Sequence, residues 1–154
     1  MIALAFAFSY LESLIPFNFG IKLGIANLVV IVALYTMNAK DALFISIIRI
    51  LLSGLAFSGP FAMIYSLIGG LLSFLVMFAA KKSNKLSPIG VSALGETVHN
   101  FGQILVAAVV MRTYRIIYYF PILMIVGLVT GILNGIIADI IIKRIAKTGD
   151  TQCQ

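Results

Sequence analysis

Charged residues are scarce in this chain. They make up 10% of its 154 residues, whereas hydrophobic residues make up 62%. The mean hydropathy is +1.13, and apolar runs recur from end to end. A soluble domain of this length could not cover so much apolar surface with polar groups. The scarcity of charge therefore excludes an ordinary soluble domain and predicts an all-α, polytopic membrane protein.

Cysteine and histidine are also scarce, since the chain has only Cys153 and His99. A single thiol offers no disulfide within the chain, and one histidine without cysteines at ligand spacing offers no zinc cluster. We therefore expect no metal site and no resident cofactor. The first segment lacks a basic leader and a small-residue cleavage site, so we expect it to be retained as a helix.

Recognisable catalytic motifs are missing. The sequence has no Walker loop, no Asp-Asp-x-x-Asp arrangement for prenyl diphosphate chemistry and no nucleophile elbow. Glu96 and His99 could form an acid–base pair, but no second catalytic element accompanies them. We expect the protein not to be an enzyme. Its net charge of +6 comes from basic residues near helix ends, which is typical of membrane proteins and does not indicate a nucleic-acid partner.

Glycine, proline and charged residues divide the chain into hydrophobic segments. These segments cover residues 1–15, 23–38, 41–58, 60–80, 89–111 and 116–142. A spanning helix takes about 20 apolar residues. The first three segments are short by this measure, so we expect tilted, broken or re-entrant helices that are buried in protein. The prediction is a six-helix bundle in a single transmembrane domain, residues 1–147, followed by a polar cytoplasmic tail, residues 148–154.

The distribution of lysine and arginine predicts the orientation, because basic residues are enriched in cytoplasmic loops. Six helices with the amino terminus inside would place seven basic residues in the cytoplasm, namely Lys40, Lys81, Lys82, Lys85, Lys143, Arg144 and Lys147. The same topology leaves Lys22, Arg112 and Arg115 outside. Both termini are therefore expected to face the cytoplasm of a multi-pass cell-membrane protein.

A polar stripe runs along the fifth segment. Its members are Ser92, Glu96, His99, Asn100 and Gln103. Spacings of three and four place them on one helical face. Because such groups are costly to bury in lipid, they must face protein or a watery cavity. The stripe indicates a polar ligand site, a proton relay or an interhelical hydrogen-bond network, and Asn134 and Asp139 of the sixth segment could complete it.

Arg49 lies inside the third segment, where a charge facing lipid would cost several kcal/mol. Glu12, Glu96 and Asp139 are the acids available to pair with it. Two interpretations stay open. Arg49 either forms a structural ion pair between helices, or it recognises a carboxylate or phosphate through its planar fork.

The connection between the first two segments contains Lys22 between Gly20 and Gly24, and Asn27 follows at helical distance. Glycines allow a backbone to approach a ligand closely. Lys22 therefore either meets an anionic group at the outer mouth or snorkels to the lipid headgroups.

Small residues at a spacing of four predict close helix packing in lipid. Gly127, Gly131 and Gly135 form such a face in the sixth segment, and Ala3 and Ala7 form one in the first. Internal packing explains both faces. Alternatively, the face on the first segment docks a partner membrane subunit, because a peripheral helix is free to pack outward.

Four stretches of the sequence resemble a known family. They are Gly20-Ile-Lys-Leu-Gly-Ile-Ala-Asn27, Arg49-Ile-Leu-Leu, Gly69-Gly-Leu-Leu-Ser73 and His99-Asn-Phe-Gly-Gln103. This order resembles the Gx transporter family, also labelled heptaprenyl diphosphate synthase component I. That family is similar to the substrate-binding S components of energy-coupling factor (ECF) transporters, which are six-helix proteins with both termini in the cytoplasm.

The resemblance implies a subunit that binds a polar or anionic, vitamin- or cofactor-like molecule from the outer face. Its candidate binding residues are Lys22, Asn27, Arg49, Glu96, His99, Asn100, Gln103 and Asn134. S components commonly meet a membrane coupling subunit through an Ala-x-x-x-Ala face, which Ala3 and Ala7 match. Transport would then also need separate ATPases, since this chain has no nucleotide site.

Two other roles stay open from the same resemblance. The chain could be the membrane subunit of an electron-transfer system that links quinone to an extracytoplasmic flavoprotein. It could instead be a noncatalytic membrane partner of a prenyl diphosphate synthase, docked through residues 81–85 or the carboxyl tail.

Overall fold

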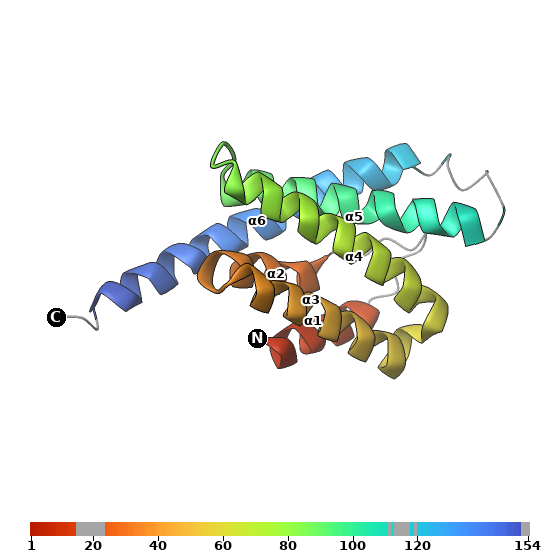
Figure 1. Cartoon of the computed structure of the whole chain (residues 1–154), viewed down its shortest axis with the longest axis horizontal. Helices are drawn as coiled ribbons and strands as arrows, with labels where there is room; N and C mark the ends of the chain where they lie inside the picture. The colour runs from red at the N-terminus through yellow and green to blue at the C-terminus, as the bar shows by residue number, and fades with distance from the viewer. Residues whose placement is uncertain (15–23, 111, 113–117, 119, 152–154) are drawn as a thin grey trace.

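The chain folds into helices packed side by side, as Figure 1 shows for a computed structural model. The structure describes residues 1–14, 24–110, 112, 118 and 120–151, with side chains through residue 147. The helices are α1 (Ile2–Leu14), α2 (Ile25–Thr36), α3 (Ala39–Ser53), η2 (Gly54–Ser58), α4 (Gly59–Lys82), α5 (Pro88–Val110) and α6 (Phe120–Thr151). No strand occurs in these described ranges, so the prediction of an all-α protein is confirmed.

The expectation of six separate helices is not confirmed as it stands. A break was expected at Ser58, Gly59 and Pro60, but α3, the π-helical turn η2 and α4 follow one another without a non-helical residue. The described residues therefore form five continuous helical stretches. The chain still changes direction at Gly59, whose φ of +81° leaves the helical region, and α4 returns alongside α3 (Figure 1). A wide π turn and a left-handed glycine thus make the bend without ending the hydrogen-bonded run.

Three of these stretches are long and apolar enough to cross a membrane: Ala39–Lys82, Pro88–Val110 and Phe120–Lys147. Many large apolar side chains on them remain exposed, including Leu55, Phe61 and Val109. Exposed apolar surface of this extent fits contact with lipid. The chain is accordingly a helical protein of the membrane.

Helix α2 forms the centre of the core. Every residue from Ala26 to Leu34 is buried, and α2 contacts α1, α3, α5 and α6. A helix that is apolar all round is expected to be buried. Its 12 residues are too few to span a bilayer of about 30 Å, so α2 lies inside the protein, as expected for a short segment.

The α5–α6 contact is built on small residues. A Cβ atom added at Gly127, Gly131 or Gly135 of α6 would lie 2.6–2.7 Å from atoms of α5, closer than van der Waals contact allows. The glycines therefore let the two backbones touch. The glycine face predicted in the sixth segment is internal packing.

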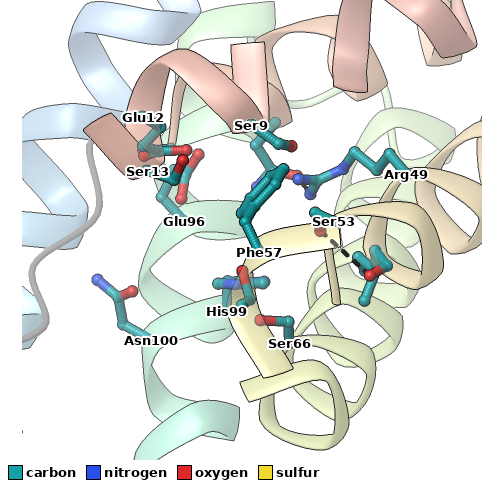
Figure 2. Close-up of a pocket in the computed structure, with 14 residues that line it drawn as sticks. Ser9, Glu12, Ser13, Arg49, Ser53, Phe57, Ser66, Glu96, His99 and Asn100 are labelled. Atoms are coloured by element: carbon teal, nitrogen blue, oxygen red, sulfur yellow. Dashed lines mark hydrogen bonds between the residues drawn. The ribbon is translucent and has the colours of Figure 1, made fainter. Parts of the chain in front are cut away.

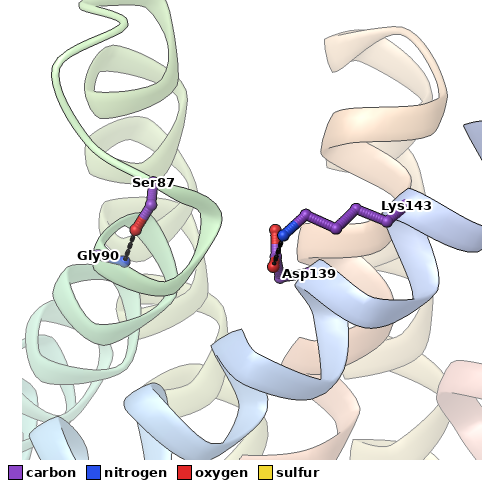
Figure 3. A network of polar contacts seen from close by, with 4 residues as sticks. All are labelled: Ser87, Gly90, Asp139 and Lys143. Carbon is purple, nitrogen blue, oxygen red and sulfur yellow. Dashed lines mark hydrogen bonds and ion pairs between the residues drawn. The ribbon is translucent and has the colours of Figure 1, made fainter.

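Polar residues fix the ends of several helices. Helix α5 begins at Pro88, and the hydroxyl of the preceding Ser87 accepts a hydrogen bond from the Gly90 N–H at 3.4 Å (Figure 3). A serine cap followed by proline is a strong helix start. At the C-terminal end of α4, the Lys81 ammonium donates to the Leu34 carbonyl at 2.6 Å and lies over the Tyr35 ring. These contacts join α4 to the end of α2.

Both termini lie at the same end of the bundle, together with the α2–α3 and α4–α5 connections (Figure 1). The seven basic residues that were assigned to one side of the membrane belong to this end. Helix α6 continues through Thr151, past residue 142, where the last hydrophobic segment was expected to end. Its polar last turns project beyond the other helices, so the first residues of the expected tail are helical.

Candidate functional site

A polar cavity lies where the C-terminal ends of α1 and α3 meet the start of α2 and the middle of α5 (Figure 2). Its lining residues come from α1, α2, α3, η2, α4 and α5 and are Ser9, Glu12, Ser13, Gly24, Asn27, Arg49, Ile50, Ser53, Phe57, Ser58, Ser66, Glu96, His99 and Asn100. Its volume is about 80 Å³. Common ligand pockets begin at about 300 Å³. The cavity therefore suits a small polar group or the polar end of a larger molecule.

A chain of hydrogen bonds crosses the cavity wall from α3 to α6. The Arg49 guanidinium donates from Nη2 to the Asn27 carboxamide oxygen at 3.1 Å. The amide of Asn27 and the side chain of Asn134 both hydrogen-bond Glu96. Asn27 thus stands between a cation and a carboxyl group that also attract one another electrostatically. All four side chains are buried, with exposed fractions of 4–8%.

Two atoms of Arg49 and Glu96 have no hydrogen-bond partner. They are Nε of Arg49, a donor, and Oε1 of Glu96, an acceptor. A buried polar atom without a partner costs about 1–3 kcal/mol, and more when the group is charged. Such atoms are rare in native proteins and are usually satisfied by water or by a ligand. The cavity wall therefore presents an open donor on Arg49 and an open acceptor on Glu96.

Gly24, at the start of α2, makes the convergence of two acids possible. Its φ is +68°, in the left-handed region that favours glycine. Its N–H donates to the Glu12 carboxylate, and a Cβ atom at this position would lie 2.3 Å from Oε1 of Glu96. The bare α-carbon thus leaves room for the Glu96 carboxyl group, while the backbone fixes Glu12 of α1.

The rest of the α5 stripe divides between the cavity and helix packing. His99 and Asn100 line the cavity (Figure 2). The Asn100 amide also donates to the Leu123 carbonyl of α6 at 3.0 Å. Gln103 does not line the cavity, but it donates to Ser66, which does, at 3.5 Å. Ser92 is buried against Gly135.

Other candidates lie elsewhere. Asp139 pairs with the exposed Lys143 at 2.6 Å (Figure 3) and does not join the network, so it is not the partner of Arg49. Ala3 and Ala7 are exposed on α1, whereas Ala5 is fully buried. Lys22 lies outside the described residues. Asn134 does not line the cavity, but it hydrogen-bonds Glu96, which does.

The sequence argument missed most of the cavity wall. It did not select the serines Ser9, Ser13, Ser53, Ser58 and Ser66. It also missed Phe57, whose ring contacts Phe6 and Tyr10 of α1. Serine is common in helices and can bond its own backbone, as Ser9 and Ser53 do. Only the concentration of serines in otherwise apolar helices could have pointed to them.

Comparison with known proteins identifies the family. The model of the family described as heptaprenyl diphosphate synthase component I matches residues 1–141. The chain belongs to this family. The resemblance seen in the sequence is therefore confirmed, and the family match includes all the residues that line the cavity. No curated protein and no solved structure matches the chain.

Proposed function

We propose that the chain is the substrate-binding subunit of a small-molecule transporter and acts as the S components of ECF transporters do. The observation that supports this most is the cavity whose wall buries Arg49 and Glu96 with unmet hydrogen-bonding atoms. Burying opposite charges without direct pairing is costly for stability alone, whereas a binding site needs them. Such a subunit has the form of a six-helix, single-domain bundle, counting α3 and α4 as separate spans.

The charge distribution supports binding from the outer face. Seven basic residues belong to the end of the bundle that carries the termini, which makes that end cytoplasmic under the positive-inside rule. The cavity is lined by the C-terminal ends of α1 and α3 and the start of α2, which lie away from the α2–α3 and α4–α5 connections (Figure 1), and its ligand enters from the outside. Lys22 belongs to the connection next to Gly24 and is proposed to meet the ligand at the mouth.

The exposed face of α1 supports docking of a coupling subunit. Ala3 and Ala7 lie on this face, and beside them runs a shallow groove lined by Met1, Ile2, Ala3, Met37, Asp41, Phe44 and Ile45. Small residues on a membrane-exposed helix allow a partner helix to pack closely. Separate ATPases bound to that subunit provide the energy for transport.

The test is affinity purification from native membranes in mild detergent, with mass spectrometry of the proteins and small molecules that co-purify. Recovery of a membrane coupling subunit, its ATPases and a small molecule supports the proposal. Recovery of an outer-face flavoprotein with quinone instead assigns the protein to electron transfer.

A second candidate function is favoured by the family match. The family description names one component of a heptaprenyl diphosphate synthase, and this sequence carries no acidic prenyl diphosphate motif. In this role the chain is a noncatalytic membrane partner of a soluble catalytic subunit. Co-purification of a prenyl diphosphate synthase, with an empty cavity, supports this alternative over transport.

A further inference from the structure

The two atoms without hydrogen-bond partners, Nε of Arg49 and Oε1 of Glu96, define which groups a ligand must offer. Oε1 of Glu96 needs a hydrogen-bond donor, and a positively charged donor matches its carboxylate best. Nε of Arg49 needs an acceptor, and a negatively charged acceptor matches the guanidinium best. Both side chains are more than nine-tenths buried, and Glu12 of the same wall acts electrostatically on both.

The two groups are also held apart. Asn27 accepts from Arg49 and bonds Glu96, and the structure contains no direct ion pair between them among its described residues. If the two groups bonded each other, their charges would be satisfied internally. The intervening carboxamide keeps them oriented toward the cavity with one donor and one acceptor left open.

From this arrangement we propose that the cavity binds a small zwitterion, with a protonated amine on Glu96 and a carboxylate on Arg49. The inference rests on the proposed function and names its substrate class. A ligand that carries both charges can hydrogen-bond Glu96 and Arg49 at once. A simple anion leaves Glu96 without a hydrogen-bond donor, and a simple cation leaves Arg49 without an acceptor. Among the five serines of the wall, Ser9, Ser13 and Ser53 already donate to backbone carbonyls, so their oxygens accept from the ligand without adding charge.

The cavity volume favours a short ligand or a short zwitterionic end. The cavity volume of about 80 Å³ is well below the about 300 Å³ at which common ligand pockets begin. A carboxylate and an amine separated by one to three carbons are of this size. A longer molecule fits only with its remaining part directed out of the cavity.

The experiment compares three probes with similar short skeletons: β-alanine, propionate and n-propylamine. Each is titrated into the purified full-length protein in lipid nanodiscs, and binding is followed by thermal shift and calorimetry. We expect β-alanine to bind about tenfold or more tightly than either singly charged probe, because each unmet charged hydrogen bond costs that much or more. Equal binding of propionate or propylamine overturns the zwitterion inference but leaves the proposed function standing.

Two variants then test which side chain binds each charged group of the ligand. Glu96→Gln keeps the size of the side chain and its contacts with the asparagines, and it should abolish the preference for β-alanine over propionate. Arg49→Gln should abolish the preference over propylamine. Asp41→Asn, which removes an exposed acid outside the cavity, is the control and should leave all three affinities unchanged. An unaltered preference in Glu96→Gln contradicts the assignment, and the wild-type comparison remains decisive if a variant does not fold.

Failure of the inference and failure of the function give different results. If no probe binds but a small molecule of another class co-purifies and is lost in Glu96→Gln, the substrate class is wrong and the binding function stands. If no probe binds and nothing co-purifies from native membranes, water alone fills the cavity and both proposals fail.

Discussion

At the scale of single residues, Gly24 controls the shape of the cavity. Gly24→Ala would place a Cβ atom 2.3 Å from Oε1 of Glu96 and would also strain a backbone with φ of +68° by about 1–2 kcal/mol. We expect this variant to lose ligand binding and to unfold at a lower temperature. Thermal unfolding and binding of the co-purified molecule measure the two effects.

Gly59→Ala is the matched control for that prediction. Gly59 has a similar φ of +81°, but a Cβ atom there would meet nothing within 4 Å. Gly59→Ala should therefore strain the backbone at least as much, because φ of +81° with ψ of 165° is open essentially only to glycine, but it should not cause the loss of binding. If Gly24→Ala binds the ligand as well as Gly59→Ala does, the carboxyl group of Glu96 does not need the space beside Gly24.

Asn100 is the second residue whose role can be tested alone. It lines the cavity and also links α5 to α6 through its bond to the Leu123 carbonyl. Asn100→Ala should weaken ligand binding and also lower the stability by about 1 kcal/mol. Thr97→Ala is the control, because the Thr97 hydroxyl bonds only within its own helix. Unfolding in detergent compares the two variants, and equal stabilities would contradict a role for Asn100 in joining the helices.

At the scale of elements, the closest contact is that of α5 with α6. Gly131→Ala would bring a Cβ atom to 2.6 Å from the Ala93 α-carbon, which is backbone and cannot rotate away. We expect the helices to separate and the stability to fall by about 1–3 kcal/mol. Gly90→Ala on α5 is the control, since its Cβ atom meets only the flexible Leu86 side chain at 3.3 Å. Denaturation in mixed micelles measures both, and a Gly131→Ala protein as stable as Gly90→Ala would contradict the close approach.

At the scale of the whole molecule, the topology predicts which loops face the outside. In a Cys153→Ser background, one new cysteine is introduced at Lys85, in the α4–α5 connection, or at Arg112, after α5. We expect a membrane-impermeant maleimide to label Arg112→Cys in intact cells and to label Lys85→Cys only after lysis. Labelling of both in lysed cells is the control. The reverse pattern in intact cells would place the termini and the seven basic residues outside.

Much of the element structure was predictable from the sequence because it depends on local composition. Apolar length and the polar break after residue 80 predicted an end at residue 80 and a start at residue 89, against Lys82 for α4 and Pro88 for α5 in the structure. Gly59 was expected to end a helix, and the chain does bend there. The π turn before Gly59 keeps the helix continuous. No residue propensity in the sequence predicted this turn.

The sequence by itself determined the class of the protein, the main helices and the presence of costly polar groups inside them, because composition and periodicity act along the chain. Only the tertiary structure decided which of these groups meet. Arg49 had three acids available, and Asn27, 22 residues away, became its hydrogen-bond partner. Asp139 instead forms an ion pair with Lys143. Partners far apart in the sequence meet only when the helices pack together. That packing depends on the glycines of α6 and on the buried α2, which bring together segments that are distant along the chain.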